Sequence, residues 1–137
     1  MEFELTVGYA SDCKKILVQI DEHTVVADGG DRSQPSPGAL FIAGLAACTA
    51  STARGYCFRN DLPFPTAVKA KLSFDDDTHI VSAVSFEVQV PPDFPQERLE
   101  ALQRAAEACT VKKYWLSPPQ FTTSVTTLET IPETRTQ

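Results

Sequence analysis

Residues 36–54 read SPGALFIAGLAACTASTAR, and this stretch decides how the rest of the chain can fold. Ser36 can cap a helix, and Pro37 fits the first helical turn, where its missing N–H costs nothing. Residues 39–50 carry no charge and only one hydroxyl group. A helix that is apolar on all sides belongs in an interior, and this one is only about half as long as a bilayer span requires. The stretch therefore predicts a buried core helix with Cys48 at its centre.

The size and charge of the chain limit what it can be. Its 137 residues are enough for one domain with its own core, so we expect a single domain over residues 1–137. The formal net charge is −6, from 12 basic and 18 acidic residues, and the absence of a Lys/Arg cluster argues against a nucleic-acid partner. The chain starts MEFEL, with acids where a secretory signal carries bases, so we expect a cytoplasmic protein with no membrane partner.

Hydrophobic periodicity predicts an α+β domain with antiparallel sheet around this helix. The expected strands have alternating apolar residues, and the expected helices end at Pro- and Gly-rich breaks. In chain order we expect strands at 3–9, 15–20 and 23–27, a loop at 28–35, the core helix at 37–58, hairpin strands at 68–74 and 80–90, an amphipathic helix over about 95–109, a short helical turn at 111–116, a last strand at 121–128, and a frayed polar end at 131–137.

The apolar helix also bears on assembly. A helix without a polar face needs cover all round, and a chain of 137 residues has little material to supply it. We therefore expect a second copy of the chain to complete the cover, as symmetric dimers are the commonest oligomers.

The four cysteines are the residues of this chain that are most able to take part in a reaction. Cys13, Cys48, Cys57 and Cys109 contain no CxxC pair, which disfavours zinc, and we expect no metal and no cofactor. Cys48 and Cys109 each lie among small residues on an apolar helix face, which fits either an inert core thiol or a reactive one. Cys13 and Cys57 are expected to have no role. In a reducing cytoplasm a disulfide would be catalytic or sensing rather than structural.

A reactive cysteine has to be a thiolate, and Cys48 lies too far along its helix for the helix dipole to stabilise one. A cation is needed instead. Arg54 is rotated away from the Cys48 face by six residues, whereas Arg32, in the loop before the helix, is free to fold back. Arg32 is therefore the better candidate.

These motifs together resemble the OsmC/Ohr family (osmotically inducible protein C and organic hydroperoxide resistance protein). The residues that carry the resemblance are the lead GGDRSQPSP, the apolar helix with Cys48, and the sequence AEAC ending at Cys109. They occur in the order found in the family, and the likeness covers most of the chain.

The resemblance implies a fold and an activity. The fold is an intertwined α+β homodimer in which antiparallel sheets wrap around two central helices. The activity is reduction of small organic hydroperoxides: Cys48 attacks the peroxide and becomes a sulfenic acid, Cys109 condenses with it to a disulfide, and a small dithiol or lipoyl group reduces that disulfide. An arginine and a glutamate stabilise the thiolate in the family, which gives Arg32 its expected role.

The chain departs from the family pattern at two positions. Gly38 occupies the place of the family's glutamate, and Thr110 follows Cys109 where the family has proline. Two functions therefore stay open. One is a hydroperoxide reductase that uses Cys48, Cys109 and Arg32. The other is a non-enzymatic OsmC-like dimer that binds a small apolar ligand and uses its cysteines only for packing.

Overall fold

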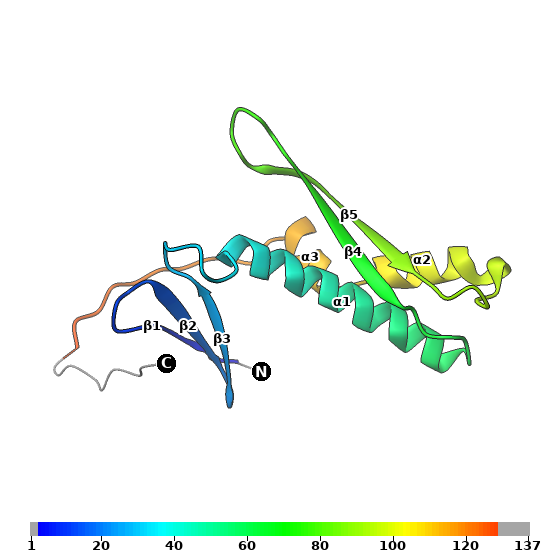
Figure 1. Cartoon of the computed structure of the whole chain (residues 1–137), viewed down its shortest axis with the longest axis horizontal. Helices are drawn as coiled ribbons and strands as arrows, with labels where there is room; N and C mark the ends of the chain where they lie inside the picture. Colours follow the sequence, from blue (N-terminus) through cyan, green and yellow to red (C-terminus); the bar gives the residue numbers. More distant parts are fainter. Residues whose placement is uncertain (1–2, 129–137) are drawn as a thin grey trace. The chain divides into compact units, whose positions relative to one another are not determined.

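The computed structural model describes residues 3–128 and contains helices and antiparallel sheets (Figure 1). These residues form two compact units, one made of 3–41 with 121–128 and the other of 42–120. The elements in chain order are β1 (Thr6–Tyr9), β2 (Lys15–Ile20), β3 (His23–Asp28), α1 (Pro37–Arg59), β4 (Ala67–Phe74), β5 (Val81–Gln89), the 3-10 helix η1 (Gln96–Arg98), α2 (Leu99–Glu107) and α3 (Thr110–Leu116).

The first unit contains a three-stranded antiparallel meander in the order β1-β2-β3. Its register pairs Val7 with Val18, and Leu17 with Val26. The β2–β3 connection is tight, with Asp21 at a positive φ of 51°, a conformation that Asp tolerates better than most residues. The three predicted strands are confirmed, except that β1 begins at Thr6 rather than at residue 3.

Both ends of α1 are set by local hydrogen bonds. At the start, the Ala39 amide donates to Ser36 Oγ at 3.1 Å, as expected for a serine cap. At the end, Asp61 takes a left-handed φ of 57°, and the Leu62 amide donates to the Cys57 carbonyl at 2.9 Å. This is a Schellman-type closure. The helix therefore ends through its own C-cap before the first of the prolines that the sequence predicted would stop it.

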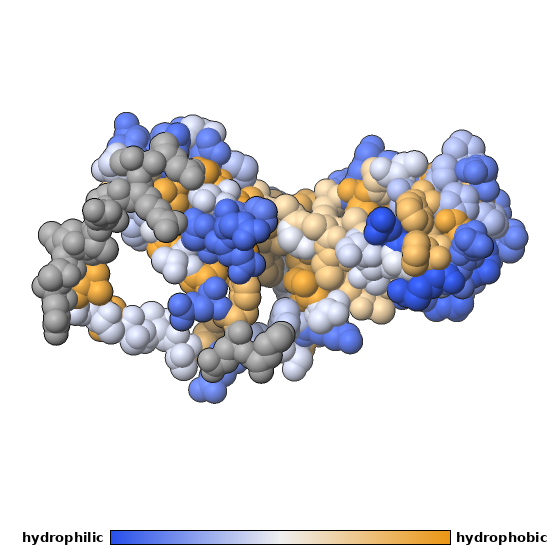
Figure 2. Space-filling model, turned by 90° about the horizontal axis from the view of Figure 1, so that it is seen from below, coloured by the Kyte–Doolittle hydropathy of each residue, from blue (hydrophilic) through white to orange (hydrophobic). Residues whose placement is uncertain are grey.

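Only one stripe of α1 is buried within the chain. Its members recur at helical spacing, and they are Ile42, Leu45, Thr49, Ala53 and Cys57. Other small positions, including Ala43, Gly44 and Ala47, are exposed. The space-filling view shows apolar side chains over the middle of this helix (Figure 2). The prediction of a helix is confirmed, whereas complete burial is not achieved by one chain.

The hairpin of β4 and β5 belongs to the second unit, and in Figure 1 it crosses α1 at an angle, with its turn pointing away from the helix. Its register pairs Val68 with Val88 and shifts once, between Ser73 and Phe74. In the turn, the Asp75 carboxylate accepts hydrogen bonds from the Thr78 amide and hydroxyl and from the Asp77 amide. The bonds from Thr78 and then Asp77 hold the pKa of Asp75 below its usual value. Of the three consecutive aspartates 75–77, Asp75 is thus the one whose carboxylate stabilises the turn through hydrogen bonds.

A small core holds the second unit together. Ala53 and Cys57 of α1 pack against Phe94 and against Leu102 and Ala106 of α2. Near this core, Arg98 Nη2 donates to Tyr56 Oη at 2.9 Å and to Asn60 Oδ1 at 3.1 Å, which ties η1 to the end of α1. These contacts hold the C-terminal part of α1 against Phe94, η1 and α2, and so they stabilise the second unit.

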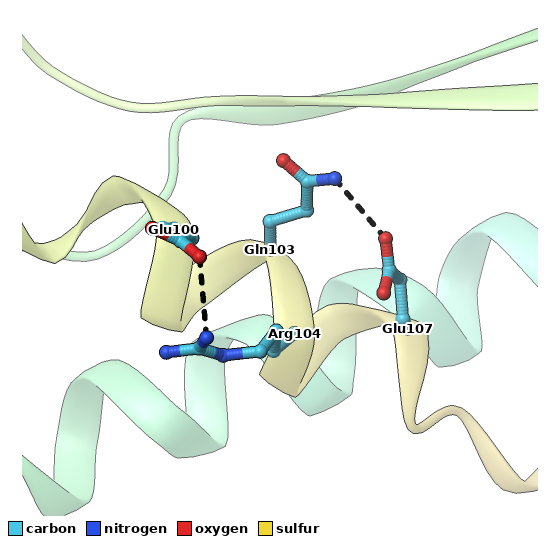
Figure 3. Close-up of polar contacts among 4 residues, drawn as sticks. All are labelled: Glu100, Gln103, Arg104 and Glu107. Carbon is cyan, nitrogen blue, oxygen red and sulfur yellow. Dashed lines mark hydrogen bonds and ion pairs between the residues drawn. The ribbon is translucent and has the colours of Figure 1, made fainter.

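The opposite face of α2 is polar (Figure 3). Arg104 Nη1 lies 3.2 Å from Glu100 Oε1, and Gln103 Nε2 donates to Glu107 Oε1 at 3.1 Å. Both pairs are exposed and span one helical turn, so each adds only about 0.2–0.5 kcal/mol. They mark the solvent side of an amphipathic helix, as the sequence predicted.

Two sequence predictions are wrong. Residues 121–128 form no strand, and Val125 is 97% exposed. Residues with strand propensity are stable in a strand when they fit a half-buried sheet surface, and the strand also needs a neighbouring strand to pair its backbone. In this structure residues 121–128 have no such surface and no such neighbouring strand. Cys109 lies beyond the end of α2, not on its packed face. The predicted frayed end at 131–137 lies outside the described residues.

The described part of the chain holds no helix that is long and apolar enough to cross a membrane.

Phe94 offers a test of this core. Its side chain is 2% exposed, so Phe94→Ala should lower the free energy of unfolding by about 3–5 kcal/mol through lost burial and a residual cavity. Chemical denaturation measures the change. Phe74→Ala is the matched control, because Phe74 on β4 is 57% exposed and its removal should change stability by about 0.5 kcal/mol or less. Equal effects of the two substitutions would contradict this packing.

Candidate functional site

Cys48 and Cys109 come together in the second unit. Cys48 lies in the middle of α1 and is half-buried, and Cys109 lies at the junction of α2 and α3 and is 1% exposed. Both thiols are free, and the Cys48 S–H donates a side-chain hydrogen bond to the Cys109 sulfur. Two cysteines that are distant in sequence thus share one contact.

The surroundings of Cys109 lower the pKa of its thiol. Burial opposes its ionisation and is the largest single influence on it. The hydrogen bond from Cys48, the amides of Lys112 and Val111, and the charge of Lys112 together outweigh burial and lower the pKa of Cys109. Both amides belong to the first turn of α3, for which Cys109 is the N-cap residue. The site therefore favours a thiolate at Cys109.

Lys112 is the charged residue that the sequence reasoning missed. Its Nζ lies 4.6 Å from the centroid of the Phe86 ring on β5, and its side chain is half-buried. The sequence-based expectation named only arginines, in the loop before the core helix and within it. The available signal was the spacing: Lys112 follows Cys109 by three residues, which brings side chains to one face of a helical turn.

The polar groups around Cys48 on α1 are satisfied within the helix. Thr52 Oγ1 donates to the Cys48 carbonyl at 2.8 Å, and the buried Thr49 Oγ1 donates to the Leu45 carbonyl at 3.0 Å. These threonines are accommodated by bonding back one turn, a common solution for hydroxyls inside helices. The Cys48 thiol is left to interact with Cys109.

The remaining predicted features take ordinary positions. Arg32 is exposed in the first unit, where its amide donates to Asp28 Oδ1 at 2.7 Å, so its pairing with Cys48 stays a prediction. The Arg54 guanidinium lies 5.0 Å from the centroid of the Phe64 ring. Gly38 leaves the first turn of α1 without an acid, and a side chain there would meet open space.

The other two cysteines differ from the pair. Cys13 is exposed, and Cys57 is fully buried in the core, where burial raises the pKa of its thiol. Among residues 3–128 the structure has no cluster of His, Cys, Asp or Glu that could hold a metal ion.

The contact between the cysteines predicts a linked titration. Cys48→Ala removes the S–H donor, so the pKa of Cys109 should rise toward its ordinary value of 9.0. The pH dependence of the Cys109 Cβ chemical shift, followed by NMR, measures this change without a reagent having to reach the buried thiol. Cys48→Ser keeps a donor and should leave the midpoint nearer to that of the unchanged protein. The same midpoint in all three proteins would contradict the contact.

Comparison with solved structures gives consistent likeness at low identity. An OsmC-like protein from Mycoplasma pneumoniae superposes with a TM-score of 0.66 and 14% identity, covering 86% of this chain and 89% of the other. The organic hydroperoxide resistance protein OhrB of Bacillus subtilis gives 0.57 and 18%, covering 86% and 93%. An OsmC-like hydroperoxide resistance protein from Jannaschia sp. CCS1 gives 0.50 and 20%, covering 85% and 84%. At these identities the likeness establishes the fold.

No curated protein matches the sequence significantly. The family model described as OsmC-like protein matches residues 29–124, which is well over half of the chain and includes Cys48 and Cys109. The α+β architecture and the structural likeness agree with this match. The chain belongs to the OsmC-like protein family.

Proposed function

We propose that this protein is a thiol-dependent reductase of organic hydroperoxides, built as one OsmC-like domain. The observation that carries the proposal is the hydrogen bond between the free thiols of Cys48 and Cys109. Two thiols in contact can be oxidised to a disulfide and reduced again without a large rearrangement of the chain. Core packing alone does not require two cysteines to be in contact. OhrB, a protein of this fold, is named for resistance to organic hydroperoxides.

The proposed reaction proceeds in two oxidative steps. Cys48 passes its proton to the Cys109 sulfur, and the resulting Cys48 thiolate attacks the terminal oxygen of the hydroperoxide; the O–O bond breaks, and the alkoxide takes that proton and leaves as an alcohol. Cys48 is then a sulfenic acid. The Cys109 thiolate attacks the Cys48 sulfur, the S–O bond breaks, and a protonated hydroxide leaves as water. The product is a disulfide, which protects Cys48 from further oxidation.

A dithiol then restores the enzyme. A small dithiol or a dihydrolipoyl group attacks the disulfide, forms a mixed disulfide, and closes its own ring as the two protein thiols are released. Over one cycle, one hydroperoxide is reduced to alcohol and water, and one dithiol is oxidised. A reducing compartment such as the cytoplasm would supply such a reductant.

The exposure of the two cysteines supports the proposed division of roles. Cys48 is half-buried and so is the more accessible to a peroxide, whereas Cys109 is 1% exposed. The lowered pKa of Cys109 suits the resolving step, because the thiolate is the attacking form. Arg32 remains our candidate for stabilising the Cys48 thiolate.

A second candidate function rests on Gly38. The first turn of α1 lacks an acid, and the family's glutamate therefore has no counterpart at this position. A protein with this departure could bind an apolar ligand without reducing it. Turnover distinguishes the two functions directly.

We further propose a homodimer, because one chain covers only one stripe of α1. Small exposed residues, such as Ala43, Gly44 and Ala47, would let a second helix approach closely. The intertwined arrangement implied by the family would bring the two α1 helices to the centre of the dimer.

Hydroperoxide consumption tests the proposed activity. The protein should consume cumene hydroperoxide in the presence of a dithiol, and Cys48→Ser should reduce the rate at least about a hundredfold by removing the nucleophile. Cys109→Ser should accumulate a sulfenic acid that dimedone traps at Cys48. Cys13→Ser is the matched control and should retain the full rate. A rate for the unchanged protein no higher than that of Cys48→Ser would refute the proposal.

A bulky residue on the exposed side of α1 tests the dimer. Gly44→Leu has open space within one chain, so it should leave the fold intact but prevent a second copy from packing there. Light scattering after gel filtration should give a dimer for the unchanged protein and a monomer for Gly44→Leu. Glu100→Leu places the same side chain on the polar face of α2 and should remain dimeric. A dimeric Gly44→Leu would show that this face is not the interface.

A further inference from the structure

A cavity of about 350 Å³ lies within the second unit, between α1, β5 and α3. Its walls are mainly apolar, with Leu45 from α1, Val84 and Phe86 from β5, and Trp115 and Leu116 from α3. Its volume is at the low end for small-molecule sites, which suits one aromatic ring or a medium-length acyl chain better than a nucleotide or a cofactor.

Lys112 is the one charged residue among those that line this cavity. Its Nζ lies against the Phe86 ring and forms no ion pair with any carboxylate in residues 3–128. Glu87 and Glu107 line a neighbouring hollow that Lys112 and Phe86 also line, and neither carboxylate forms an ion pair with the ammonium group. A half-buried ammonium group beside an apolar wall has lost part of its hydration, and an anion at the same wall would compensate for that loss.

We propose that this cavity binds a small organic carboxylate, with its acyl or aryl group against Phe86 and Trp115 and its carboxylate paired with Lys112. A single ammonium group matches a monoanion. A phosphate dianion would call for more donors than one lysine offers, and no arginine lines the cavity.

Two of the residues that line the cavity are related to the cysteine pair. Leu45 precedes Cys48 by three residues on α1, and the charge of Lys112 acts on Cys109. If the proposed reductase activity holds, the occupant is the substrate, a hydroperoxide that also bears a carboxylate. That clause rests on the proposed function, whereas carboxylate binding does not.

The only tryptophan of the chain reports on the cavity. Because Trp115 lines it, occupancy should change the intrinsic fluorescence without any added label. We would titrate the reduced protein with decanoate and, as a neutral match of equal chain length, with decanol. Decanoate should give saturable binding about tenfold tighter than decanol, the size of effect expected for one charge-assisted contact.

Variants of Lys112 identify the anchor. Lys112→Met keeps the aliphatic stem and removes the charge, so decanoate binding should weaken about tenfold while decanol binding stays the same. Lys112→Arg should restore preference for the carboxylate. Lys113→Met is the matched control, since Lys113 is exposed and absent from the cavity wall, and it should bind like the unchanged protein.

The outcomes separate this inference from the proposed enzyme. Equal affinities for decanoate and decanol, or an unchanged decanoate affinity in a folded Lys112→Met, would overturn it, as would a fluorescence that decanoate does not alter. The unchanged protein alone decides the first and last outcomes, so misfolding of a variant cannot leave the question open. Tight decanoate binding without cumene hydroperoxide turnover would refute the reductase and leave the carboxylate site standing.

Discussion

The burial of one stripe of α1 is the constraint on which the second unit depends. Ala53 and Cys57 are fully buried against Phe94 and α2, and this contact sets both the axial position and the rotation of the helix. Thr49, Ala53 and Cys57 are four residues apart and share the buried face, whereas Cys48 comes one residue before Thr49 and is rotated from it by about 100°, so the packing of this stripe also fixes the direction of the Cys48 side chain. The packing of the core and the geometry of the thiols are therefore consequences of one arrangement.

The electrostatics of the site are unequal between its two cysteines. Cys109 is nearly inaccessible, yet a thiol donor, two amides and an ammonium group favour its thiolate. Cys48 is more accessible, and the hydroxyl groups of its helix neighbours Thr49 and Thr52 donate hydrogen bonds to backbone carbonyls of α1. In a two-thiol cycle these properties are complementary, since one sulfur has to meet the substrate and the other has to attack the oxidised intermediate without being oxidised itself. Lys112 adds a charge that acts on the second sulfur, and the same residue lines the cavity.

Several features of the fold could be predicted from particular residues. Ser36 and Pro37 marked the start of α1, and alternating residues marked the strands of both sheets. Predictions failed where local pattern was insufficient. Residues 121–128 have the composition of a strand but pair with none, and α2 ends before Cys109 although the apolar spacing continues. In both cases the outcome depends on which neighbour is available, and neighbours distant in sequence leave no local signal.

The sequence by itself determined the apolar helix with its central cysteine, the α+β order of elements and the likeness to the OsmC/Ohr family, because these follow from residue type and spacing along the chain. The tertiary structure alone decided that Cys48 meets Cys109, that the charge of Lys112 acts on Cys109 within the second unit, and that Lys112 also lines a cavity. Hydrogen bonds and charge interactions act over a few ångströms in space, and only folding brings residues from α1, β5 and α3 within that range.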